Sequence, residues 1–65
     1  MDLNDLKGLE GKSVWIVLKN NREYNGIIKK IDDDGNGLIF ISLIDKFGKL
    51  VVFTSGEIKM LQEKG

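Results

Sequence analysis

The sequence of 65 residues contains no cysteine, no histidine and no proline. The absence of cysteine excludes disulfides and thiolate metal ligands, and the absence of histidine excludes imidazole ligands and imidazole bases. We therefore expect no catalytic residues, no bound metal, no cofactor and no enzymatic activity. A chain of this size buries only roughly 60% of the surface that it exposes when unfolded. Because disulfides and metals are excluded, self-association is the expected source of additional stability.

The charges balance, with ten basic and ten acidic side chains and no formal net charge. A neutral chain lacks the long-range field that draws basic proteins onto nucleic acids or anionic membranes, so any RNA binding must depend on a local arrangement of charges. No apolar run approaches the length of a membrane span, and no signal peptide is visible. The expected location is the cytoplasm, with no membrane partner.

The apolar residues change their spacing along the chain. The first leucines recur at helical spacing before a glycine stop, and from Ser13 onward the apolar residues alternate as in strands. Turns rich in asparagine, aspartate and glycine separate these runs. The pattern predicts a single domain over residues 1–65, with a helix over 2–8 and strands over 12–19, 22–31, 38–45, 49–54 and 57–62.

The short connections between the predicted strands favour consecutive antiparallel pairing, and hence a meander. Several strands are apolar on both faces, so the sheet must bend over on itself into a small barrel whose edges meet a neighbour. Trp15 is interpreted as a core residue because apolar residues surround it. Gly26 lies inside a strand, where glycine marks a sharp bend or a close approach of another backbone.

The acidic turn allows two interpretations. Asp32, Asp34, Asn36 and Gly37 match the first half of a calcium-binding loop. The twelfth position of such a loop is a bidentate glutamate, but here it is Leu43, and the flanking segments are strands rather than helices. A plain acidic turn without a metal is therefore the favoured interpretation.

Basic residues also allow two interpretations. They could form a stripe that contacts RNA, with Tyr24 or Phe47 as a surface on which bases stack. Alternatively, they keep the outer face soluble and protect strand edges, and charge alone favours this second reading. The residues concerned are Lys19, Arg22, Lys29 and Lys30.

Two stretches resemble the motifs of a known family. The segments 9–14 and 17–26, followed by Asp32 and Asn36, resemble the first motif of the Sm and Sm-like (Lsm) proteins. The C-terminal stretch around Ser55 and Gly56 resembles a reduced form of the second motif. On these residues the chain is similar to a small, archaeal-type member with a degenerate second motif.

The resemblance implies a mainly β fold, in which a short N-terminal helix caps a strongly bent, five-stranded antiparallel sheet. It also implies homo-oligomeric rings of six or seven subunits, closed by pairing the fourth strand of one subunit with the fifth strand of the next. Members of the family bind uridine-rich single-stranded RNA at the inner rim and act in RNA processing or as RNA chaperones.

The resemblance also assigns roles to residues. Asn36 would bond the base edge and Asp32 would orient its loop. The position that stacks on the base is Asp34, which cannot stack, and the position of the arginine that covers the base is Ser55, whereas Gly56 is retained.

Because Asp34 and Ser55 differ from the residues that the family has at these positions, two functions are considered. In the first, a ring with a weakened uridine pocket binds single-stranded RNA partly through Lys29 and Lys30. In the second, the same fold serves as a protein-interaction or scaffold module that does not bind RNA bases.

Overall fold

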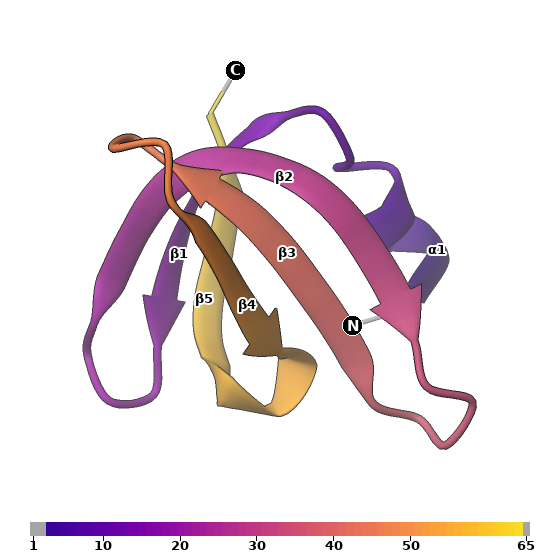
Figure 1. Cartoon of the computed structure of the whole chain (residues 1–65). Coiled ribbons are helices and arrows are strands. Elements are labelled where there is room, and N and C mark those ends of the chain that lie inside the picture. The colour runs from indigo at the N-terminus through magenta and orange to yellow at the C-terminus, as the bar shows by residue number, and fades with distance from the viewer. Residues whose placement is uncertain (1–2, 65) are drawn as a thin grey trace.

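The computed structural model of the chain describes residues 3–64, which form a short helix and a five-stranded antiparallel sheet (Figure 1). The helix is shorter than predicted, and residue 2 of the predicted helix lies outside the described residues. The elements are α1 (Leu3–Lys7), β1 (Ser13–Leu18), β2 (Glu23–Asp33), β3 (Ile39–Asp45), β4 (Leu50–Thr54), the 3-10 helix η1 (Ser55–Glu57) and β5 (Ile58–Glu63).

The strands are ordered β4-β3-β2-β1-β5. Consecutive pairing was correctly predicted for β1 to β4 but was wrong for β5, which pairs with β1 instead of β4. The reason is the connection: η1 replaces a tight hairpin, and the Lys19 N–H donates to the Glu57 carbonyl at 2.8 Å, which directs β5 along the free edge of β1. The sheet is therefore strongly bent but not closed, and β4 and β5 are its edges.

Alternation along β1 separates the two faces of the sheet as predicted. Val14, Ile16 and Leu18 are buried, whereas Trp15 and Val17 on the other face are half-buried. The interpretation of Trp15 as a core residue was therefore wrong. Its indole Nε1–H donates to a Glu23 carboxylate oxygen at 3.0 Å, and an indole N–H needs such a partner, which the apolar core does not supply.

The core lies on the concave side of the bent sheet and is closed at one end by α1. Leu6 of α1 is buried against it, which gives this short helix the tertiary support that an isolated helix lacks. No buried polar or charged residue occurs among the described residues. The buried side chains are Leu6, Val14, Ile16, Leu18, Ile28, Ile31, Ile39, Ile41, Leu43 and Phe53.

Gly26 lies where the backbone of β3 approaches β2 closely, which is one of the two interpretations that its position in the strand allowed. A Cβ atom at Gly26 would overlap the Ile44 carbonyl oxygen and lie 2.9 Å from the Asp45 Cα, so only glycine fits. Further along β2, the pairing with β3 shifts register between Ile28 and Lys30. The loop before β1 supports this irregular stretch.

The α1–β1 loop supplies three contacts to the irregular part of β2, and in one of them the Ile28 N–H donates to the Lys12 carbonyl at 3.0 Å. The Glu10 carboxylate accepts the Ile31 N–H at 2.8 Å, and the Gly11 N–H donates to the Ile28 carbonyl at 2.7 Å. These contacts satisfy backbone groups that a regular ladder would otherwise pair.

Most strand boundaries differ from the predictions by one residue, and the end of β2 differs by two. β2 continues to Asp33, beyond the predicted end at 31, because Asp32 and Asp33 still pair with β3. β5 begins at Ile58 rather than at 57, because Glu57 belongs to η1. Within residues 3–64 no helix is long and apolar enough to cross a membrane.

Replacing Gly26 by alanine is expected to destabilise the fold by about 3 kcal/mol or more, because the new methyl group meets backbone atoms that cannot rotate away. The measurement is urea unfolding followed by the fluorescence of Trp15. Gly56→Ala is the matched control, because no atom lies within 4 Å of its added Cβ. Equal stability of the two variants would contradict the steric constraint at Gly26.

Candidate nucleic-acid interface

The β2–β3 loop is held by its own aspartates. Asp33 accepts the Gly35 N–H at 2.5 Å, and Asp34 Oδ1 accepts the N–H groups of Asn36 at 2.7 Å and Leu38 at 3.1 Å. Gly35 adopts a φ of 83°, which glycine reaches without steric cost. These bonds order the segment on which Asn36 is exposed.

The end of this loop meets η1 around a recess of about 380 Å³, which we call the loop hollow. Figure 1 shows both segments at the same end of the molecule. Neither an aromatic ring nor a charged side chain lines the loop hollow within the described part of the chain. Its lining residues are Gly37, Ile39, Ser55, Gly56 and Ile58.

The predicted site residues fall into separate groups. Ser55 and Gly56 line the loop hollow, and Asn36 directly precedes its lining residue Gly37. Asp34 uses its carboxylate to hold the loop amides, as does Asp33, which sequence reasoning did not single out.

The remaining predicted residues lie on β2. Asp32 extends the strand opposite Phe40, and its carboxylate lies 3.4 Å from Lys30 Nζ. Lys29 and Lys30 are exposed and are not among the lining residues of the loop hollow. The fold therefore brings the two motif regions together but leaves the two lysines on the strand.

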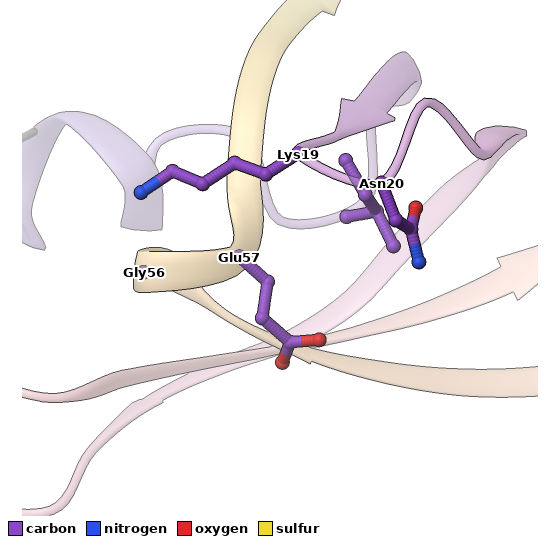
Figure 2. A pocket seen from close by; sticks show the side chains of 5 residues that line it. Lys19, Asn20, Gly56 and Glu57 are labelled. Atoms are coloured by element: carbon purple, nitrogen blue, oxygen red, sulfur yellow. The ribbon is translucent and has the colours of Figure 1, made fainter.

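A second recess, of about 260 Å³, lies beside η1 and also includes Gly56 (Figure 2). Leu18, Lys19 and Asn20 contribute from the end of β1 and the β1–β2 turn, and Glu57 contributes from η1. In Figure 2 the Lys19 and Glu57 side chains extend in different directions, so the contact between these two segments is the backbone hydrogen bond described above.

The aliphatic side chains that line the loop hollow were not predicted as part of a site. Ile39 was placed in the predicted strand over 38–45, although its position three residues after Asn36 could have indicated a place beside the loop. Gly37 was considered only as part of a possible calcium loop. Among residues 3–64, no group of three or more acidic side chains is arranged to hold a metal ion.

Glu57 stabilises the turn between β4 and β5. Its carboxylate accepts the Thr54 N–H at 3.0 Å and the Thr54 hydroxyl at 2.9 Å. The backbone hydrogen bond, followed by the side-chain hydrogen bond, lowers the pKa of Glu57 below its ordinary value of 4.5. Glu57 thus orders the backbone of Ser55 and Gly56, which line the loop hollow.

A depressed pKa in the folded state contributes stability that is present above the unfolded pKa and is lost as the pH falls through the folded value. We expect Glu57→Gln to melt at a lower temperature than the unmodified chain at pH 7, and the difference to shrink as the pH falls below about 4. Thermal unfolding by circular dichroism between pH 3 and 7 measures this. A gap that stays constant over this range would contradict a role for the Glu57 charge.

Comparison with known proteins gives one family. The LSM domain model matches residues 4–39, which cover more than half of the chain and include most of α1, all of β1 and β2, and the β2–β3 loop. No curated protein and no solved structure shows significant similarity to the chain. The match, together with the bent five-stranded sheet and its helix, shows that the chain belongs to the LSM domain family, whose Sm-like members are generally associated with RNA.

Proposed function

We propose that this protein assembles into a closed ring of identical subunits and associates with single-stranded RNA through a weakened base pocket and exposed lysines. The observation that carries the proposal is the loop hollow, in which the end of the β2–β3 loop meets η1 in a chain of the LSM family. The expected setting is RNA processing or RNA chaperoning in the cytoplasm.

Ring formation is supported by the two edges of the sheet. β4 and β5 lie at opposite ends of the strand order, so the outer side of each is free to pair with a strand of another copy. Exposed apolar side chains accompany both edges: Leu50 is 57% and Val52 54% exposed on β4, and Met60 is 42% exposed on β5. A contact between two different edges is head-to-tail, and such contacts close into rings when the rotation between copies allows it.

A weakened base pocket is supported by the lining of the loop hollow. Base stacking on an aromatic ring contributes about 1–3 kcal/mol per base, and this lining provides no ring. Asp33 and Asp34 carry negative charge beside Asn36, which repels the RNA backbone. Asn36 thus supplies a base-edge contact without the stacking that makes such a contact strong.

Residual RNA binding is supported by the lysines of β2. Lys29 and Lys30 are exposed, and the Lys30–Asp32 pair is a surface ion pair of the kind that contributes little energy. The ammonium of Lys30 therefore remains available to a phosphate. Contacts of this kind confer affinity but little selectivity among bases.

The assembly is tested by the mass of the protein in solution. We expect six or seven times the mass of one chain, and Val52→Lys is expected to yield smaller species because it places charge at the β4 edge. Ile27→Lys is the matched control, because Ile27 is 52% exposed on β2, which is paired on both sides. Light scattering coupled to size-exclusion chromatography measures all three proteins. A stable single chain at high concentration would overturn the ring.

RNA binding is tested by fluorescence anisotropy with labelled decamers of uridine and adenosine. We expect weak binding that differs little between the two RNAs, weakens as salt increases and is lost when Lys29 and Lys30 are both replaced by glutamate. Asn36→Ala is expected to change the affinity by less than about threefold, since an unsupported hydrogen bond contributes little net energy. Submicromolar, uridine-selective binding that Asn36→Ala abolishes would show an intact pocket and contradict the proposal.

The scaffold function is the alternative, and the lack of an aromatic lining in the loop hollow favours it. If the protein binds neither RNA even at low salt, the RNA function is excluded. Recovery of a defined protein partner after nuclease treatment would then support the scaffold.

A further inference from the structure

A third recess lies at the opposite end of the sheet, between the start of β2 and the β3–β4 hairpin. We call it the hairpin hollow. Its volume is about 150 Å³, well below the roughly 300 Å³ at which pockets for small-molecule ligands begin, so it suits a single side chain. Its lining residues are Glu23, Tyr24, Asn25, Asp45, Lys46 and Phe47.

The hairpin itself is well ordered. Asp45 Oδ1 accepts the N–H groups of Phe47 at 2.9 Å and Lys49 at 2.8 Å, and the Gly48 N–H donates to the Asp45 carbonyl at 3.0 Å. The Lys46 N–H donates to the Asn25 carbonyl at 3.1 Å, which joins the hairpin to β2. These bonds fix the backbone of Phe47, although its side chain is 77% exposed and adds almost nothing to the core. An aromatic side chain held out by an ordered loop is suited to contact a partner.

The polar groups of the hairpin hollow accept hydrogen bonds more than they donate them. Glu23 and Asp45 contribute two carboxylates against the one ammonium of Lys46, a net charge of −1. The Asn25 Oδ1 atom is buried and has no hydrogen-bond partner among the described residues. An unpaired buried oxygen is energetically unfavourable, and the broad terminal torsion of asparagine allows the carboxamide to turn toward a donor. A ligand that fits this recess carries positive charge and several N–H groups.

From this lining we propose that the hairpin hollow binds an arginine side chain of a partner protein. The guanidinium stacks on the Phe47 ring and donates to Asn25 Oδ1 and to the carboxylates of Glu23 and Asp45. The ring already attracts a cation, because Lys46 Nζ lies 5.3 Å from its centroid. A planar guanidinium stacks better and is less strongly hydrated than this ammonium, so it displaces Lys46. The two carboxylates disfavour the phosphate that accompanies a nucleobase.

The probe is the blocked tripeptide glycyl-arginyl-glycine amide, titrated into the ¹⁵N-labelled assembled protein. We expect saturable shifts in the Asn25 side-chain amide and in the backbone amides of Phe47 and Gly48, with half-saturation in the millimolar range. The peptides with citrulline or lysine in place of arginine are expected to bind at least about threefold more weakly, because citrulline has no positive charge and lysine has no planar guanidinium group. Shifts confined to other signals, or equal binding of the citrulline peptide, would overturn the proposal.

Substitutions in the lining are expected to change the affinity for arginine in opposite directions. Phe47→Ala and Glu23→Gln are expected to weaken arginine binding about fivefold each, and the glutamine can still accept the Trp15 N–H. Lys46→Ala is expected to tighten arginine binding severalfold, because the substitution removes a positive charge that repels the guanidinium and competes for the Phe47 ring. Asp5→Asn on α1, which removes one carboxylate elsewhere, is expected to change nothing. Adenosine monophosphate tests the competing hypothesis that the recess binds a nucleotide. If it shifts the same signals and Lys46→Ala weakens its binding, the recess is a nucleotide site and the arginine proposal fails.

Discussion

The close approach of the Gly26 backbone to the Ile44 carbonyl is the contact on which the rest of the sheet depends. A side chain at this position would separate β2 from β3. With glycine there, β2 arches over the core, and the Tyr24 and Phe53 rings meet with their centroids 4.9 Å apart. β5 pairs with the other side of β1, so β4 and β5 remain as the two edges of the sheet.

The bent sheet separates two regions of different chemistry. At one end, backbone and small or aliphatic side chains line the loop hollow, beside exposed aspartates. At the other end, an exposed phenylalanine lies between carboxylates and one lysine. A chain without net charge can therefore present different local surfaces, because each depends on which few residues the strands bring to one end.

Local alternation and local turn chemistry made much of this structure predictable. The apolar spacing in β1 follows directly from the period of a strand, and a glycine inside β2 indicates the close approach of another backbone. Trp15 was misassigned because a strand pattern alone does not say which of two apolar faces is covered. The pairing of β5 was misassigned because the sequence does not distinguish the capped turn formed by Thr54 and Glu57 from an ordinary hairpin turn.

The amino-acid sequence by itself determined the number of strands, the placing of a glycine inside β2 and the family, because these depend on the spacing and the type of residues along the chain. Only the tertiary structure decided that β5 lies beside β1, that Gly37 meets Ser55 and Gly56 at one recess, and that Asn25 and Phe47 share another. These contacts join residues far apart in sequence. Their geometry depends on how far the whole sheet curls, and no local pattern encodes that amount.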